Sequence, residues 1–574
     1  MTNEQQLLDD VKADAEYYGS LNPPERDEYG GLLGSREAFG LNATGFFHIE
    51  KLNGKFVMVD PTGNLYFSLG VNGVGYTGDT FTMVKGREYI YEWLPEKDGP
   101  YNTAFLNNNP DYFSFYVANK IRKSGGAPFN SADFYNESVY RLKKWGFTSE
   151  GAWSSTPEDA LIISPFPQVK MLDLPSSYMI GNSGLFDIYK PNAAEEIAAA
   201  LRAQGVPDRK DNPMIIGYFF GNEIPYHNFR SVISSSKASQ VATKGALVEM
   251  LRNKYDDDID AFNAAWESGF ASFDELKEAS LTVRTEEASA DINEFMEQYL
   301  DKFYSVISTE FRKQDPNHML LGDRYLVNTM NNKDVREMLC RVAGKYLDVI
   351  SYNYYTYDLD MNRILTMSQL AGKPLMLTEF HYGEPTQGLT GGVRVLDNEE
   401  EKGWGYRNYV EKAAASGVVV GTHWFEFLDQ AATGRWFQGY EGESYGIGLL
   451  NVADRPYKKM LESVMATNYD IYQLILGQKA PFSYDFGPGR SERNSNNKVN
   501  IPKANAPIVI DGIKDASWPS GQTISLDDKD RVLGVRNEEV SAEFNLAWDS
   551  NYLYIYAHIQ DPTPLENAYD GFDI

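Results

Sequence analysis

The chain has 574 residues, of which 42% are hydrophobic, so it can bury a large core and is too long for one ordinary domain. Lys and Arg number 53 against 81 Asp and Glu, which gives a formal net charge of −28. A surface of this sign repels nucleic acids and anionic membranes, and we expect neither as a partner. The longest apolar runs are also too short for a membrane span.

Cysteine and histidine offer little capacity for metal binding. Cys340 is the only cysteine, which excludes an internal disulfide and a cysteine-based metal site. The six histidines are scattered and lack the spacing of a metal-binding motif. We therefore expect no metal and no other cofactor.

Aromatic residues make up 14% of the chain, with 38 Tyr and 9 Trp. One interpretation is a large, tyrosine-rich surface. The other is a sugar-binding cleft, because the flat C–H faces of pyranose rings stack on aromatic side chains, while Tyr and Trp keep a polar end for hydrogen bonding. Composition alone leaves both interpretations open.

Residues 1–45 are polar and irregular, apart from a short helix expected near Leu7–Tyr17, and form a predicted N-terminal extension. They contain no basic stretch followed by an apolar one, so no signal peptide is visible. Two short strand patterns then flank Asn53-Gly54, which predicts a β-hairpin between Phe46 and Val59.

Apolar, strand-like runs then alternate with helical patterns. The 3–4 spacing from Ile292 to Phe311 predicts a helix that stops before Pro316, and Asn192 with Glu195 predicts a capping box at the start of another. Repeated strand-then-helix units predict an α/β fold with a parallel sheet, and eight of them favour closure into a (β/α)8 TIM barrel over residues 46–476. A doubly wound open sheet is the alternative, but no GxGxxG follows the first strand. The eight runs are Tyr66–Asn72, Gly146–Ala152, Val169–Leu172, Met214–Glu223, Met319–Arg324, Leu347–Asn353, Pro374–Phe380 and Val418–Phe427.

The barrel is expected to end with one helix, Tyr457–Leu476. Residues 477–505 are rich in Gly, Pro, Ser and Asn, which predicts a linker. In residues 506–574, the alternation of Ala542–Trp548 and Tyr552–Ile559 predicts antiparallel strands. A β-sandwich module typically has about 100 residues, so we expect only a partial C-terminal sandwich here.

Two of the apolar runs have a glutamate at or next to their last residue. The fourth ends with Asn222-Glu223 and the seventh contains Thr378-Glu379. Because the active site of a (β/α) barrel lies at the C-terminal ends of its strands, both carboxyl groups should reach the same mouth. Glycosidic cleavage needs one protonated carboxyl to protonate the leaving oxygen and one carboxylate to attack the anomeric carbon. A separation of about 5–5.5 Å would predict retention of configuration. Either glutamate alone could be an ordinary surface residue.

An Asn-Glu pair after the fourth strand and a Glu after the seventh resemble the signature of clan A glycoside hydrolases. The resemblance implies that Glu223 is the acid/base, that Asn222 contacts the sugar 2-hydroxyl and that Glu379 is the nucleophile. The eighth run, which includes Gly421–Glu426, is also similar to this clan. That similarity implies that Trp424 forms the floor of the reactive sugar subsite.

Within the clan, the sequence between about residues 45 and 475 is most similar to family 50 β-agarases. The similar segments include Phe56–Asn72 (FVMVDPTGNLYFSLGVN), Arg141–Ser154 (RLKKWGFTSEGAWS), Gly217–Pro225 (GYFFGNEIP) and Tyr445–Asn451 (YGIGLLN). The segment after residue 506 resembles the start of a family 9 carbohydrate-binding module. The family resemblance implies a secreted or periplasmic location.

Further residues near strand ends are candidate substrate contacts, each with ordinary packing as the alternative. Arg324 is expected to pair with its neighbour Asp323 rather than bind sulfate, and Tyr355 could instead orient the nucleophile. The candidates are Asn72, Trp153, Tyr355, His381 and His423, and the expected polar rim residues past the eighth strand are Glu426, Asp429 and Glu443.

The sequence therefore leads to the hypothesis of a retaining glycoside hydrolase that cleaves β-1,4-galactosidic bonds in agarose-like red-algal galactans by double displacement. Its expected partner is a polysaccharide or oligosaccharide substrate. A carrageenan or porphyran hydrolase, or a β-galactosidase, would use the same two glutamates. A non-catalytic polysaccharide-binding barrel is the alternative from another class. The mode of attack, endo or exo, and the oligomeric state are left open.

Overall fold

The computed structural model describes residues 5–158, 163–385, 388–487, 490, 501–514, 516–520, 523–526 and 541–560. The chain divides into two units. The first comprises residues Met1–Tyr355 and Leu359–Ser483, and the second comprises Thr356–Asp358 and Tyr484–Ile574.

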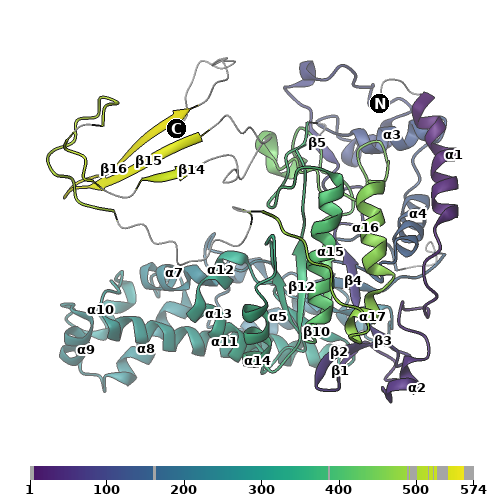
Figure 1. Ribbon diagram of the computed structural model, residues 1–574. Coiled ribbons are helices and arrows are strands. Elements are labelled where there is room, and N and C mark those ends of the chain that lie inside the picture. Colours follow the sequence, from purple (N-terminus) through teal and green to yellow (C-terminus); the bar gives the residue numbers. More distant parts are fainter. Residues whose placement is uncertain are drawn as a thin grey trace. The chain divides into compact units, whose positions relative to one another are not determined.

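Eight parallel strands form the centre of the first unit (Figure 1). The two strands at the ends of the sheet meet through one parallel bridge between Tyr325 and Tyr352, so the barrel is nearly closed. The predicted α/β barrel is confirmed: seven of the eight predicted runs contain a barrel strand, and the third, Val169–Leu172, overlaps its strand, which begins one residue earlier at Gln168. In sheet order the strands are β10 (Met319–Gly322), β9 (Ile215–Phe219), β8 (Gln168–Met171), β7 (Ser149–Glu150), β4 (Ser68–Val71), β13 (Val419–Trp424), β12 (Leu375–Phe380) and β11 (Ile350–Asn353).

The predicted hairpin closes the N-terminal end of the barrel. Strands β1 (His48–Leu52) and β2 (Lys55–Val59) join through Asn53 and Gly54, whose φ angles of 52° and 81° suit a tight primed turn, and the short β3 (Leu65–Tyr66) follows. Phe47 and Met58 from the hairpin belong to the same buried apolar cluster as Met319 and other residues from the starts of the barrel strands. The hairpin thereby covers the starts of the strands, and the cleft described below lies at the opposite end of the barrel.

Helices surround the barrel of the first unit. The long helix α11 (Glu286–Gln314) buries Phe295, Tyr299 and Phe303 along one face and ends before Pro316, as its spacing predicts. The others are α1 (Gln5–Ser20), α2 (Ser35–Phe39), α3 (Phe115–Lys123), α4 (Ser131–Lys144), α5 (Ala193–Ala203), α6 (Val206–Arg209), α7 (Phe229–Ser235), α8 (Ala242–Lys254), α9 (Ile259–Trp266), α10 (Phe273–Glu278), α12 (Val327–Asn331), α13 (Lys333–Ala343), α14 (Met361–Ala371), α15 (Glu399–Ala415), α16 (Lys458–Asn468) and α17 (Ile471–Ile475). A two-stranded sheet joins β5 (Phe81–Met83) to β6 (Tyr112–Ser114).

Two local predictions about helices are wrong. The predicted helix Tyr457–Leu476 is two helices, α16 and α17, which are separated at Tyr469-Asp470. The predicted capping box at α5 does not form, because Asn192 has a φ of 61° and its side chain makes no hydrogen bond to the helix. None of the helices among the described residues combines the length and the apolar composition that crossing a lipid bilayer requires.

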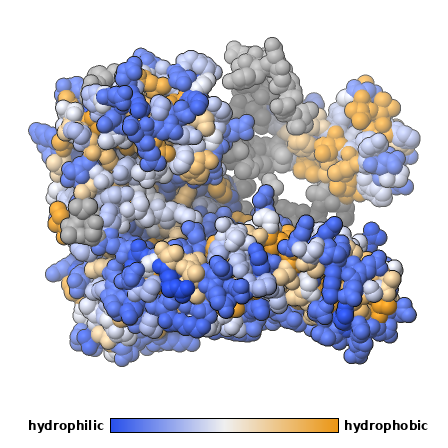
Figure 2. Space-filling view, turned by 180° about the vertical axis from the view of Figure 1, so that it is seen from behind, coloured by the Kyte–Doolittle hydropathy of each residue, from blue (hydrophilic) through white to orange (hydrophobic). Residues whose placement is uncertain are grey.

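The described part of the second unit contains an antiparallel sheet of β14 (Ile524–Leu526), β15 (Ser541–Trp548) and β16 (Leu553–Gln560). The predicted antiparallel strands are confirmed. Leu553, Ile555 and Ile559 alternate along one face of β16 and are exposed, and Figure 2 shows apolar residues gathered on this unit. An apolar face of this kind is what a β-sandwich buries against its second sheet. Part of the predicted linker, residues 491–500, lies outside the described residues, and the domain boundaries stay predictions.

Two carboxyl groups share a buried site beneath the barrel. The Oδ1 atom of Asp60 accepts hydrogen bonds from the backbone of Thr62 at 2.8 Å and of Asn64 at 3.0 Å. The other oxygen faces Asp27, and a Cβ atom placed on Gly31 would lie 2.1 Å from Asp60 Oδ2 and 2.7 Å from Asp27 Oδ2. Burial and the charge of Asp27 raise the pKa of Asp60 to about 7.

This shared site predicts a pH-dependent stability. Between about pH 4 and pH 7 the folded protein keeps a proton on Asp60 that the unfolded chain releases, so the free energy of unfolding should fall as the pH rises through this window. Asp60→Asn keeps the acceptor oxygen and has no proton to lose. Its melting temperature relative to the wild type should therefore rise by about 2 °C or more from pH 4 to pH 7 in calorimetric scans.

Asp98→Asn is the matched control, since the side chain of Asp98 is 90% exposed. The difference in melting temperature between Asp98→Asn and the wild type should stay constant from about pH 4 to pH 7. If the melting-temperature difference between Asp60→Asn and the wild type is also constant over this pH range, the prediction is contradicted.

Candidate active site

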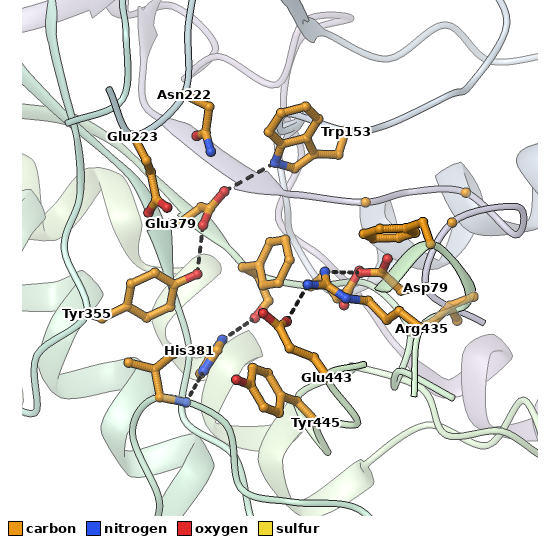
Figure 3. Close-up of a pocket in the computed structure, with 18 of the residues that line it drawn as sticks. Asp79, Trp153, Asn222, Glu223, Tyr355, Glu379, His381, Arg435, Glu443 and Tyr445 are labelled. Atoms are coloured by element: carbon orange, nitrogen blue, oxygen red, sulfur yellow. Dashed lines mark hydrogen bonds and ion pairs between the residues drawn. The ribbon is translucent and has the colours of Figure 1, made fainter. Parts of the chain in front are cut away.

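A cavity of about 760 Å³ opens where the barrel strands end (Figure 3). Its lining includes Glu223 and Asn222, which follow β9, and Glu379, which lies in β12. Trp153, after β7, and Tyr355, after β11, complete this side of the wall. The volume is within the range of about 300–1,000 Å³ that is typical of small-molecule sites. Two glutamates more than 150 positions apart in the sequence therefore meet in one cleft.

Three donors hold the carboxylate of Glu379. Arg324 Nη2 lies 2.7 Å and Trp153 Nε1 3.2 Å from its Oε1 atom. The hydroxyl of Tyr355 donates to Oε2 at 2.7 Å. Glu379 is only 6% exposed. Both oxygens are thus fixed in direction, and a buried guanidinium stabilises their charge.

Glu223 lies in different surroundings. Its hydrogen-bond donor is the amide of Asn353, whose Nδ2 atom is 3.2 Å from Glu223 Oε1 and equally far from Asn222 Oδ1. Burial and the negative charge of Glu379, which Figure 3 shows beside it, raise the pKa of Glu223. A half-buried carboxyl group with a raised pKa can keep a proton and deliver it.

The backbone holds Glu223 in this position. Its φ of 55° is in the left-handed region, which is uncommon for a residue with a side chain. Its N–H donates to the carbonyl of Arg324 at 3.2 Å. Arg324 itself has a φ of 50°, so two adjacent loops adopt unusual turns that direct their side chains toward the cleft.

A layer of hydrogen bonds supports the two glutamates from below. The hydroxyl of Thr378 donates to Asn353 Oδ1 at 2.8 Å. The carbonyl of Thr378 accepts from Arg324 Nη2 and from Asn72 Nδ2, at 3.0 Å in each case. Asn72 is fully buried and does not line the cavity. The prediction that it contacts substrate is corrected, because its side chain holds strand β12 in place instead.

The two predicted contacts from β13 also lie outside the cavity. Trp424 is fully buried, its indole N–H donates to the carbonyl of Ile447 at 2.9 Å, and its ring packs on Phe380. His423 is buried in the barrel interior, with Nε2 2.9 Å from Ser68 Oγ. Successive side chains of a strand point to opposite faces, and neither face of β13 reaches the cleft before the strand ends. Neither Trp424 as a subsite floor nor His423 as a contact agrees with the structure.

His381 lines the cavity, but the backbone occupies both of its ring nitrogens. Nδ1 lies 3.1 Å from the carbonyl oxygen of Phe425, and Nε2 accepts from the backbone N–H of Val393 at 2.8 Å. Burial lowers the pKa of His381 to about 3, so the ring is neutral. Its ring packs edge-on against Tyr355 at 4.9 Å. His381 therefore supports the wall of the cleft through the backbone, and its contact with substrate stays a prediction.

The partner of Arg324 was also predicted wrongly. It binds Glu379, whereas Asp323 accepts hydrogen bonds from Tyr226 at 2.6 Å and Tyr304 at 3.1 Å. The left-handed turn at Arg324 separates the two neighbouring side chains. Asn353 was not predicted as a site residue, although its signal was present, since it is the polar residue that ends the sixth apolar run.

Past β13, the predicted rim residues have different roles. Glu426 and Glu443 line the cavity. Asp429 does not, because its carboxylate is buried and accepts from the hydroxyl of Tyr457 at 2.5 Å and the backbone of Gly448 at 2.8 Å. In the described part of the chain, no group of three or more His, Cys, Asp or Glu side chains is arranged to hold a metal ion.

Comparison with known proteins points to one group of enzymes. The chain is 28% identical over 508 residues to β-agarase B of Vibrio sp. (strain JT0107), a match that covers 79% of this chain and 50% of that protein. It therefore spans half the length of this relative. Among solved structures, an exo-β-agarase superposes with a TM-score of 0.73 at 26% identity, covering 83% of this chain and 71% of the other. PfGH50B gives the same score and identity, covering 83% and 72%.

The barrel region is family 50 β-agarase-like. This expectation from the sequence is confirmed, and the chain is a distant homologue of those enzymes. Residues 510–573 match the "Carbohydrate family 9 binding domain-like" family. The expected resemblance of the C-terminal segment to a family 9 module is confirmed as well.

The coupling between the two glutamates can be tested directly. Glu379→Gln should lower the pKa of Glu223, because the like charge that raises it is removed while the positive charge of Arg324 remains. The measurement is a ¹³C titration of the glutamate carboxyl groups, with Glu223→Gln to assign the signal. Glu443→Gln should shift the same pKa downward by less, since Glu443 contributes less to it. An unchanged pKa in Glu379→Gln would show that the two groups do not interact.

Proposed function

We propose that this protein is a retaining glycoside hydrolase that cleaves β-1,4-galactosidic bonds in agarose-like galactans. The observation that carries the proposal is the unequal environment of two carboxyl groups in one cleft. Glu379 is bound by a guanidinium and two further donors, whereas Glu223 has a raised pKa and an amide donor. The distant homology to β-agarases supports a galactan as the substrate.

In the proposed reaction, the carboxylate of Glu379 attacks the anomeric carbon while Glu223 gives its proton to the leaving glycosidic oxygen. The C–O bond breaks, and a glycosyl ester of Glu379 forms. The negative charge of Glu379 is then lost, so the pKa of Glu223 falls and the same residue can accept a proton from water. As Glu223 takes this proton, the water oxygen bonds to the anomeric carbon and the ester C–O bond to Glu379 breaks, so the sugar is released with Glu379 ionised and Glu223 protonated again.

Other features of the cleft favour a sugar as the ligand. The ring of Trp153 is 48% exposed and lines the cavity, so it offers a face on which a pyranose can stack. Asn222 is exposed beside Glu223, within reach of a hydroxyl group of the sugar being cleaved. Since a polymeric galactan cannot cross a membrane, the proposal includes a location outside the cytoplasm.

The proposal predicts which substrates yield new reducing ends. Agarose and its oligosaccharides should be cleaved faster than porphyran or carrageenan, and Glu379→Ala should reduce the rate by at least ~10³-fold because no covalent intermediate can form. Glu37→Ala, which removes an exposed carboxylate far from the cleft in the sequence, is the control and should be fully active. If carrageenan alone is cleaved, the assignment of agarose-like galactans as the substrate is wrong. If the protein binds galactans but releases no reducing ends from any of them, it is a binding protein and not an enzyme.

The role of Glu223 predicts a second, different phenotype. Glu223→Ala should lose most of its activity on agaro-oligosaccharides but keep its first step on a dinitrophenyl glycoside, whose leaving group needs no proton. Added azide should restore turnover by attacking the intermediate in place of activated water, and a glycosyl azide of retained configuration should appear by NMR. Equal losses on both substrates with no azide product would exclude Glu223 as the acid/base.

A further inference from the structure

The loop that follows β13 brings a second aromatic ring to the cavity. Phe437 lies in the 3-10 turn Trp436–Glu441 and is 53% exposed, and it lines the same cavity as Trp153. The guanidinium of Arg435 lies over its ring, 4.9 Å from the centroid. A cation on one face of the ring holds it in place. The exposed part of the phenyl ring thus presents an apolar surface at the cleft, with no polar end of its own.

Arg435, which lies over this ring, belongs to a cluster of charged side chains. Arg435 Nη1 lies 3.2 Å from Asp79 Oδ2, and Nη2 lies 2.6 Å from Glu443 Oε2. All three residues line the cavity, and Figure 3 shows them well apart from Glu223. Asp79 and Arg435 are mostly buried, while a third of the Glu443 side chain is exposed. The cluster is held together by its own ion pairs before any ligand arrives.

Glu426 forms the floor of this cluster. It is 4% exposed, and its Oε1 atom accepts from the amide of Gln430 at 3.1 Å. A Cβ atom on Gly73 would lie 2.8 Å from its Oε2 atom, so this wall is closely packed. Burial and the neighbouring charge of Asp79 raise the pKa of Glu426 well above its usual value. Asp79 and Glu443 both pair with the guanidinium of Arg435, so two carboxylates face one cation above this floor.

An exposed aromatic ring beside fixed hydrogen-bonding groups has the composition of a sugar-binding site. A pyranose can lay its C–H face on a phenyl ring, and its hydroxyl groups can donate to carboxylate oxygens at the edge. An anionic sugar fits poorly here, because the guanidinium of Arg435 is already bound on both sides and the remaining charge is negative.

We propose that Phe437 with Glu443, Arg435 and Asp79 forms a second sugar subsite, which accepts a neutral pyranose and rejects a sulfated or carboxylated one. The inference rests on the proposed function, because it assigns the next sugar units of the same substrate to this part of the cleft. It makes Phe437 and Glu443 residues that determine chain-length preference and charge selectivity, separate from the two catalytic glutamates.

Binding measured without turnover tests the subsite. In full-length Glu223→Gln protein, calorimetric titration gives the Kd of neutral agaro-oligosaccharides of increasing length. Phe437→Ala should weaken the binding of the longer members at least about tenfold and leave the shortest unchanged, and Phe437→Tyr should restore the binding. Tyr89→Ala is the control, since Tyr89 is 85% exposed and does not line the cavity. The C-terminal domain is the same in every variant and cancels in the comparison.

Charge selectivity is tested with a sulfated galactan oligosaccharide of equal length. Its Kd should be at least about tenfold higher than that of the neutral oligosaccharide. Glu443→Gln should reduce this ratio of Kd values, because it removes a carboxylate and frees one side of Arg435. Equal weakening of short and long oligosaccharides by Phe437→Ala, or a ratio that Glu443→Gln leaves unchanged, would overturn the subsite. If the wild-type protein cleaves no galactan but the length-dependent loss is found, the proposed function fails and the subsite stands.

Discussion

The buried guanidinium of Arg324 is the interaction on which the site depends. Its Nη2 atom binds both the carboxylate of Glu379 and the carbonyl of Thr378, and its own backbone carbonyl accepts the N–H of Glu223. One residue therefore positions the two glutamates relative to each other. Burying a cation is costly unless it is paired, and here Glu379 supplies the negative charge. The rings of Trp153 and Phe219, each 5.5 Å from the guanidinium carbon, shield this pair.

This arrangement explains how two identical side chains acquire different chemistry. The positive charge and the phenol of Tyr355 are on the side of Glu379, while Glu223 has the neutral amide of Asn353. The like charge of Glu379 then raises the pKa of Glu223, so the first carboxylate determines the protonation of the second. The hairpin covers the starts of the strands, and these groups meet in the cleft at the opposite end of the barrel.

The barrel could be predicted from the sequence because its signals are local. Each buried strand is a short apolar run, and Asn222, Glu223 and Glu379 lie at the ends of such runs. The local sequence does not determine which face of the sheet a residue occupies at the end of a strand. The pairing of β12 with β13 shifts its register between Leu377 and Phe380, and such irregularities decide whether a side chain enters the cleft. Trp424 and His423 were misplaced because both are buried within β13, which ends before either of its faces reaches the cleft.

Arg324 and the loop after β13 show a second limit. A left-handed turn at an arginine has no signal in composition or periodicity, yet it changes the partner of that residue from Asp323 to Glu379. Likewise, Phe437 reaches the cleft on an irregular loop that is held by the ion pair between Arg435 and Asp79, more than 350 positions earlier. Glu379 is thus placed by a regular strand and Glu223 by the turn that follows one, whereas the proposed subsite is placed by a loop. Because loops vary more readily than strands, the proposed enzyme can keep its bond-breaking chemistry while its preference for one galactan over another changes.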